Sequence, residues 1–143
     1  MTASPNRLVA TIVGAVYLLV GLLGFTVSSG FGFAAPAGGL LFGFIQVNDL
    51  QNVVHLLIGA VLVLCGVRST RAAKRGNAVI GTFALVVGLV GLYLSGMPAN
   101  VLALNGAGNA LHFGTAILLL AASLGAEKPL PKRKGTQPAN RTR

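Results

Sequence analysis

The sequence has little charge, few acidic residues and few of the aromatic residues that usually mark a membrane surface. Its 143 residues include two acidic residues, one cysteine, two tyrosines and no tryptophan. One cysteine excludes an intrachain disulfide, and a charged fraction of 9% excludes an ordinary soluble domain. Anchoring at a membrane surface must therefore come chiefly from the seven phenylalanines.

The apolar residues are gathered into four long segments. Hydrophobic residues make up 54% of the chain, and each segment is close to the roughly 20 residues that cross a bilayer core. The segments predict transmembrane helices at about residues 8–27, 49–67, 77–95 and 107–125. We therefore expect an all-α fold, an integral membrane four-helix bundle that forms one transmembrane domain over residues 1–125.

The basic residues lie outside these segments and on alternate connections. Four of them fall between the second and third predicted helices: Arg68, Arg71, Lys74 and Arg75. Others follow in the tail at 126–143, whereas the connections at 28–47 and 95–108 carry none. The positive-inside rule then places both termini of a multi-pass protein in the cytoplasm.

The tail at 126–143 is polar, basic and contains proline, a composition that predicts disorder. Besides the bilayer itself, its charges suit anionic lipid headgroups at the cytoplasmic face. The tail has no aromatic side chain on which a base could stack, so no nucleic-acid partner is expected.

Two short motifs suggest that the chain is an internal duplication. Asn52-Val53-Val54-His55 and Asn109-Ala110-Leu111-His112 contain both histidines and stand 57 residues apart. Glycine pairs precede them, in Gly21-Leu22-Leu23-Gly24 and Gly88-Leu89-Val90-Gly91. Because each unit contains two spans, the pattern predicts two parallel helical hairpins, with both motifs near the extracytoplasmic face.

Small residues recur at helical spacing on all four segments, and each histidine lies on such a stripe. Small side chains mark close helix contact in lipid, so the histidines are expected to point into the bundle. The predicted packing glycines are Gly14, Gly21, Gly59, Gly66, Gly81 and Gly88. Glycine stripes also permit lateral association, which predicts a homo-oligomer or a membrane partner protein.

Three interpretations of the histidines stay open. The favoured one is a structural polar layer, formed by Asn52, His55, Asn109 and His112, in which each Asn-His pair hydrogen-bonds across helices or to loop carbonyls. The alternative is that His55 and His112 hold a haem iron or a metal ion, and the third is a proton relay. Zinc would need three or four donors, and Asp49, the nearest acid, lies about 120° round the helix from His55.

Other polar residues have simpler interpretations. Asn48 and Asp49 open the second predicted helix, with Asn48 as its cap and Gln51 placed as in a capping box. The uncharged connection at 28–47 holds four phenylalanines, so it should lie in the membrane interface and could cover the histidines. No phosphate-binding glycine loop, serine nucleophile with a base, or cysteine pair is present, which indicates a non-enzymatic protein.

The segment Leu41-Phe42-Gly43-Phe44-Ile45-Gln46-Val47-Asn48, running into Asn52-Val53-Val54-His55-Leu56-Leu57-Ile58-Gly59, carries a family resemblance together with the later Asn109 to His112. It resembles the bacterial four-span membrane family of unknown function, of the domain of unknown function 4383 type. The resemblance covers residues 7–124. It implies four helices and a bacterial plasma membrane, and it implies no activity.

Overall fold

The computed structural model describes residues 4–125; the tail predicted to be disordered lies outside them, from residue 126. The helices are α1 (Pro5–Ser28), α2 (Asp49–Arg68), α3 (Thr70–Leu94) and α4 (Gly106–Gly125), and the strands are β1 (Gly39–Leu41) and β2 (Ile45–Val47). All four helices are long and apolar enough to cross a membrane. The predicted all-α membrane bundle is therefore confirmed, with one small two-stranded hairpin added to it.

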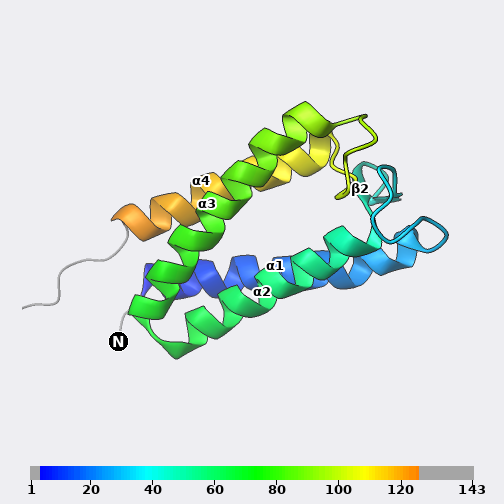
Figure 1. The fold of residues 1–143 in the computed structure, drawn as a ribbon. Helices are drawn as coiled ribbons and strands as arrows, with labels where there is room; N and C mark the ends of the chain where they lie inside the picture. Colours follow the sequence, from blue (N-terminus) through cyan, green and yellow to red (C-terminus); the bar gives the residue numbers. More distant parts are fainter. Residues whose placement is uncertain (1–3, 126–143) are drawn as a thin grey trace, which may run out of the picture.

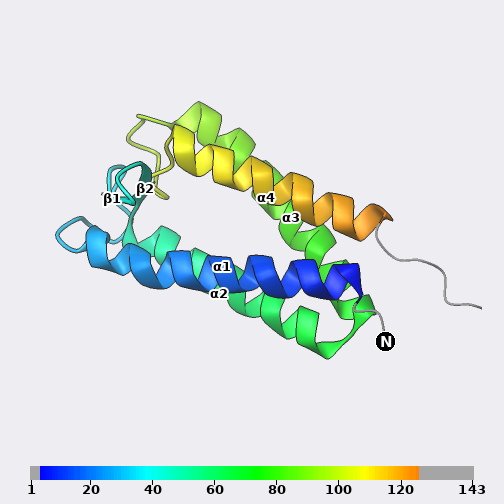
Figure 2. The ribbon, with the colours of Figure 1, turned by 180° about the vertical axis from the view of Figure 1, so that it is seen from behind.

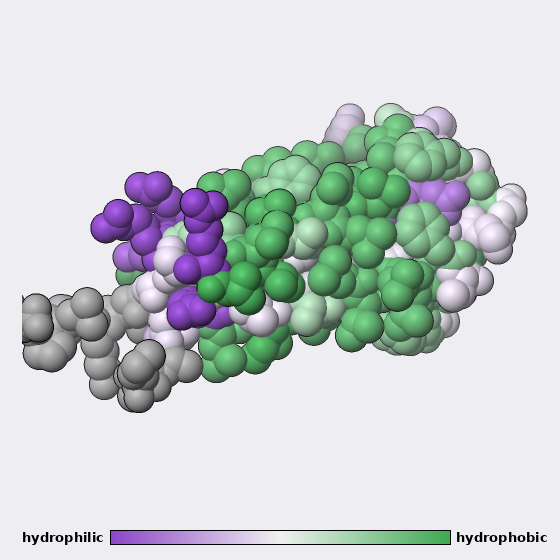
Figure 3. Space-filling view, turned by 90° about the horizontal axis from the view of Figure 1, so that it is seen from below, coloured by the Kyte–Doolittle hydropathy of each residue, from purple (hydrophilic) through white to green (hydrophobic). Residues whose placement is uncertain are grey.

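The helices form two hairpins that lie side by side (Figures 1 and 2). α1 packs chiefly against α2, and α3 packs chiefly against α4. The start of α1, the α2–α3 turn and the end of α4 lie at one end of the molecule, and the β-hairpin lies at the other. Figure 3 shows a continuous apolar belt between a strongly hydrophilic end and a mildly polar one. This distribution matches a bilayer core between two aqueous faces.

The third helix begins at Thr70, seven residues before the predicted start near residue 77. Ser69 both ends α2 and caps α3, since its N–H reaches the Cys65 carbonyl and its hydroxyl accepts the N–H of Ala72 at 3.1 Å. Arg71, Lys74 and Arg75 therefore lie in the first turns of α3 and not in a loop. The predicted start was wrong because these basic residues were assigned to a connection. Long basic side chains are compatible with a helix end, since they can extend along the surface until their charges reach water.

The six predicted packing glycines face partner helices within the chain. A methyl group on Gly14 would lie 2.8 Å from the Gly59 carbonyl oxygen, and one on Gly21 would lie 2.8 Å from the Asn52 carbonyl oxygen. A methyl group on Gly66 would meet the Thr11 hydroxyl first and then the backbone of α1, whereas Gly81 and Gly88 meet the side chains of Leu120 and Phe113. α1 and α2 thus touch backbone to backbone, and α3 and α4 are held apart by side chains.

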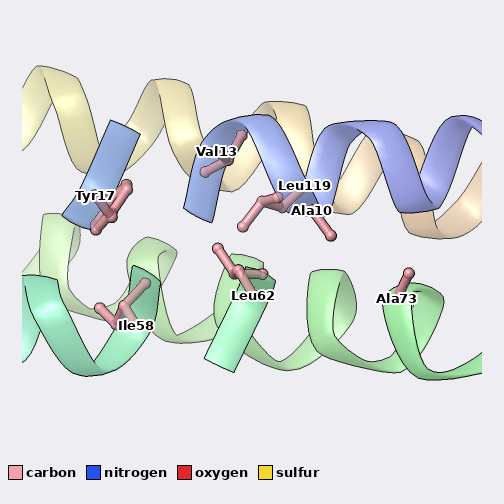
Figure 4. Packing of buried hydrophobic residues seen from close by; sticks show 7 residues of the cluster. All are labelled: Ala10, Val13, Tyr17, Ile58, Leu62, Ala73 and Leu119. Atoms are coloured by element: carbon pink, nitrogen blue, oxygen red, sulfur yellow. The ribbon is translucent and has the colours of Figure 1, made fainter. Parts of the chain in front are cut away.

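Where all four helices meet, the core is small and apolar (Figure 4). Its buried residues are Ala10, Val13, Tyr17, Ile58, Leu62, Ala73 and Leu119. α2 contributes Leu62 and α4 contributes Leu119, and neither residue is exposed at all. Because lipid tails are as apolar as leucine, close packing here stabilises the bundle through dispersion and not through exclusion of water.

The connection between α1 and α2 folds over the outer end of the bundle. β1 and β2 pair antiparallel, with Leu41 opposite Ile45, and these two side chains pack with Val47 and Val20 beneath them. The turn of the hairpin exposes Phe42 and Phe44, whose rings lie 6.5 Å apart. Phe42 has φ 54°, a conformation that costs an aromatic residue about 1–3 kcal/mol.

Candidate functional site

Two asparagines bind the outer connections of the two repeats to each other. Asn48 caps α2 by accepting the N–H of Gln51 at 2.9 Å, and Asn105 caps α4 by accepting the N–H of Gly108 at 2.9 Å. The Asn48 amide also donates to the Val101 carbonyl at 2.8 Å, while the Asn105 amide donates to the Phe44 carbonyl at 2.8 Å. Each cap therefore holds the loop of the other repeat.

Residues 57 positions apart have matching hydrogen bonds and matching burial in the two hairpins. Asn48 corresponds to Asn105, and Phe44 corresponds to Val101, so the two cross-loop bonds are reciprocal. All seven buried residues of α2 have a buried counterpart in α4 at the same spacing. This agreement extends the Asn-x-x-His repeat upstream to the capping asparagines. Sequence reasoning missed Asn105, although the shared spacing of Asn48 and Asn105 was a signal that could have found it.

Other polar side chains at the outer end of α2 also form hydrogen bonds within the chain. Ser28, the last residue of α1, donates to the Asp49 carboxylate and accepts from the Asn52 amide at 3.1 Å. Gln51 does not complete the expected capping box. In the amide orientation that suits its surroundings, its nitrogen donates to the carbonyls of Leu102 at 2.6 Å and Gln46 at 3.0 Å.

The asparagines of the two motifs use their amide oxygens in an unusual way. The side-chain oxygens of Asn52 and Asn109 are buried and have no conventional hydrogen-bond donor among the described residues. The Asn52 oxygen occupies the space that a Cβ atom on Gly24 would take, and the Asn109 oxygen occupies the same space at Gly91. The glycine Cα–H bonds therefore point at these oxygens, which is the geometry of a weak Cα–H···O contact.

The two histidines meet in the centre of the bundle, one turn below this layer. Their ring centroids are 6.0 Å apart, with 42° between the ring planes, and the exposed fractions are 0% for His55 and 3% for His112. No ring nitrogen of either histidine has a hydrogen-bond partner among the described residues. The structural-layer interpretation expected hydrogen bonds from these rings. Among the described residues Asn52 makes such a bond, to Ser28, whereas neither histidine ring does.

Tyr17 closes one side of the histidine pair. Its ring lies edge-on to His55, with centroids 5.2 Å apart, and its buried hydroxyl donates to Thr115 at 3.0 Å. The repeat is broken at this point, because the counterpart of Thr115 in α2 is Ile58. Outside this bond, an open apolar groove of about 370 Å³ runs between α1 and α4, with Tyr17 and Thr115 in its lining.

The surroundings of the pair do not suit a haem. A porphyrin between the two imidazoles would displace Tyr17, which packs against His55. Its propionates would also need cations, and the basic residues of the described chain lie at the opposite end of the helices, at Arg7 and at 68–75. Within residues 4–125, no three side chains of histidine, cysteine, aspartate or glutamate form a group that could hold a metal ion.

The hydrophilic end carries a second polar cluster. The Arg7 guanidinium donates to the carbonyls of Gly66 at 2.8 Å and Val67 at 3.0 Å, and so satisfies the last turn of α2. Nearby, three arginines frame a groove of about 600 Å³ at the α2–α3 turn, whose walls are apolar. The groove is lined by Arg68, Arg71, Arg75, Val61, Leu64 and Val79, among others.

Comparison with known proteins identifies one family. Residues 7–125 match the family described as Domain of unknown function (DUF4383). No curated protein and no solved structure matches the chain.

Proposed function

Because the chain belongs to the family described as Domain of unknown function (DUF4383), we propose from its own geometry that it is a non-enzymatic accessory protein of the bacterial plasma membrane. The observation that carries this proposal is the use of its polar groups. At the outer end, hydrogen bonds within the chain engage the side chains of Asn48, Asn52, Asn105, Ser28, Asp49 and Gln51. Side chains that are engaged in hydrogen bonds within the bundle are not free to perform acid–base or nucleophilic chemistry.

We orient the protein with both termini in the cytoplasm. The start of α1 and the end of α4 lie at the same end as the arginines of the α2–α3 turn. The opposite end carries Asp49 and no basic residue among the described positions. Basic residues concentrate on the cytoplasmic side of membrane proteins, and that rule supports this orientation.

Anionic phospholipid is the partner that the cytoplasmic end suits best. The groove at the α2–α3 turn places Arg68, Arg71 and Arg75 above apolar walls, so a phosphate and an acyl chain could be held together. Asp49 is the one acidic residue in the described range, and it lies at the other end of α2. Within residues 4–125 the three guanidinium groups therefore have no carboxylate competing for them.

A protein partner or a second copy would have to use the outer end. The packing glycines that suggested lateral association are occupied by contacts within the chain, and they no longer support it. The outer aromatic cap, formed by Phe31, Phe33, Phe42 and Phe44, is exposed on every one of its rings. We assign to this cap the contact with a membrane partner, at the level of the lipid headgroups.

Cysteine labelling in intact cells tests the proposed topology. In a Cys65→Ala background, Phe33→Cys should react with a membrane-impermeant maleimide added from outside, because Phe33 is exposed on the outer cap. Lys74→Cys, exposed at the other end, should react only after the membrane is permeabilised. The opposite pattern, or equal labelling of both positions, would overturn the orientation.

A further inference from the structure

We propose that His55 and His112 form a two-coordinate site for one soft monovalent cation of the copper(I) class. This inference goes beyond the accessory role and does not depend on it. It begins from the four buried ring nitrogens, none of which has a partner in the described chain. A neutral imidazole has one N–H donor and one bare nitrogen acceptor, and leaving such groups unpaired in a dry core costs about 1–3 kcal/mol each.

The spacing of the rings fits a single bridging ion. A metal held by one nitrogen from each ring, at about 2 Å, places the ring centroids roughly 6 Å apart. The observed separation is 6.0 Å. The 42° between the ring planes is no obstacle, because a linear nitrogen–metal–nitrogen unit leaves rotation about its own axis free.

The number of donors selects the coordination chemistry. Within residues 4–125 no third histidine, cysteine or carboxylate joins the pair, whereas zinc takes at least three protein donors. The Tyr17 hydroxyl is bound to Thr115, and Asp49 is bound to Ser28. Copper(I) is a d¹⁰ ion whose d electrons impose no preferred geometry, and two imidazole nitrogens can bind it in linear two-coordinate geometry.

The lack of nearby negative charge selects a monovalent ion. The cost of placing an ion in a medium of low dielectric constant rises with the square of its charge, so a divalent ion would cost about four times as much. Asp49, the one acid of the described chain, begins α2 six residues before His55, about 9 Å along the helix. Hard monovalent cations prefer several oxygen ligands, which the pair does not offer.

A buried polar layer lies just outside the pair, toward the outer end of the bundle. Asn52 and Asn109 each lie three residues before a histidine, and a helix rises about 4.5 Å over that length. An ion that reaches the outer asparagine layer therefore has one turn of helix left to cross. The side facing α1 stays closed, because Tyr17 packs edge-on against His55.

Anaerobic titration of the full-length protein in detergent tests the site. Copper(I), kept reduced with ascorbate and buffered by bicinchoninate, should bind with one ion per chain. X-ray absorption should show two nitrogen neighbours and no sulfur. His55→Ala and His112→Ala should each weaken binding by more than about 100-fold. Silver(I), which has no accessible redox change, should compete for the same site.

Two further variants separate ligation from folding. Cys65→Ala should leave binding unchanged, because this thiol lies ten residues, or about 15 Å, along α2 from His55. His55→Met keeps a soft donor, so copper(I) should still bind while one nitrogen neighbour is replaced by sulfur in the absorption spectrum. That exchange cannot arise from a purely structural role of His55.

Several results would overturn the site. Wild-type protein that keeps its helical circular dichroism but binds no copper(I) would refute the site. Tighter binding of zinc than of copper(I), or binding that survives both histidine-to-alanine changes, would exclude the assignment. The proposed orientation is tested separately by the cysteine-labelling pattern, which this titration does not use.

Discussion

At the scale of single residues, two asparagine side-chain oxygens lie close against glycines of the neighbouring helix. Asn52 lies against Gly24, and Asn109 lies against Gly91, so the same contact occurs once in each hairpin. A Cβ atom at either glycine would occupy the space of the amide oxygen. Close approach of backbone and polar side chain is the reason for glycine at these two positions.

Gly24→Ala and Gly91→Ala should each lower the free energy of unfolding, by about 1–3 kcal/mol, because the helices must separate or the amide must leave its place. Titration with sodium dodecyl sulfate in mixed micelles, followed by far-ultraviolet circular dichroism, measures this change. Gly114→Ala is the matched control. It meets no atom within 4 Å, so alanine there should be neutral or stabilising by up to about 1 kcal/mol. Equal effects at all three positions would refute the contact as the cause.

The histidine pair shows where prediction at this scale reached its limit. The spacing of Asn52 and His55 correctly implied a shared helix face, because residues three apart are neighbours on a helix. Whether a ring nitrogen finds a partner depends on rotamers and on side chains from other helices. Tyr17 and Thr115, which lie 98 residues apart, bond to each other beside the histidines, and no local pattern indicates that they meet.

At the scale of helices, the length and periodicity of the apolar segments predicted four helices. The charged residues at 71–75 led to a wrong start for the third helix. α3 begins at Thr70 because Ser69 caps it, whereas its first turns contain Arg71, Lys74 and Arg75, residues typical of a loop. Asn105 was missed because it falls in the connection at 95–108, before the predicted start of the fourth helix near residue 107. The cross-loop bonds of Asn105 and Asn48 join distant segments, so they depend on the tertiary fold and not on helix propensity.

The early start of α3 creates the arginine groove and leads to a prediction about lipid. Changing Arg68, Arg71 and Arg75 together to glutamine should weaken binding of an anionic phospholipid such as phosphatidylglycerol by roughly 100-fold, since each charge near the surface contributes about 1 kcal/mol. Native mass spectrometry of protein in lipid nanodiscs measures the bound lipid. Zwitterionic phosphatidylcholine should bind equally to both forms.

Lys74→Gln is the control for the groove. Lys74 carries the same charge on the same turn of α3, but it does not line the groove, so its loss should leave bound phosphatidylglycerol nearly unchanged. Glycerol phosphate, which has the headgroup charge and no acyl chain, should fail to displace the lipid. If Lys74→Gln lowers bound phosphatidylglycerol as much as changing one groove arginine to glutamine does, the lipid is attracted by general surface charge and not by a site.

At the scale of the whole molecule, the two hairpins are copies of one repeat. The contacts between them are polar at the outer end and apolar at the centre. Leu62 and Leu119, 57 residues apart, are both fully buried in the shared core. Asn48 and Asn105 then tie each hairpin to the loop of the other. The hairpins are therefore expected to unfold as one unit.

Asparagine-to-serine changes test this coupling, because serine caps a helix about as well as asparagine but is too short to donate across to the opposite loop. Asn48→Ser and Asn105→Ser should each lower the free energy of unfolding by about 1–2 kcal/mol, since a cross-loop carbonyl loses its donor. The double variant should cost less than the sum of the two by at least about 0.5 kcal/mol, because the first change already loosens both outer loops. Detergent unfolding curves of the four proteins give the coupling energy. Strictly additive costs would mean that each asparagine stabilises only its own hairpin, and the reciprocal bonds would then have no part in joining the repeats.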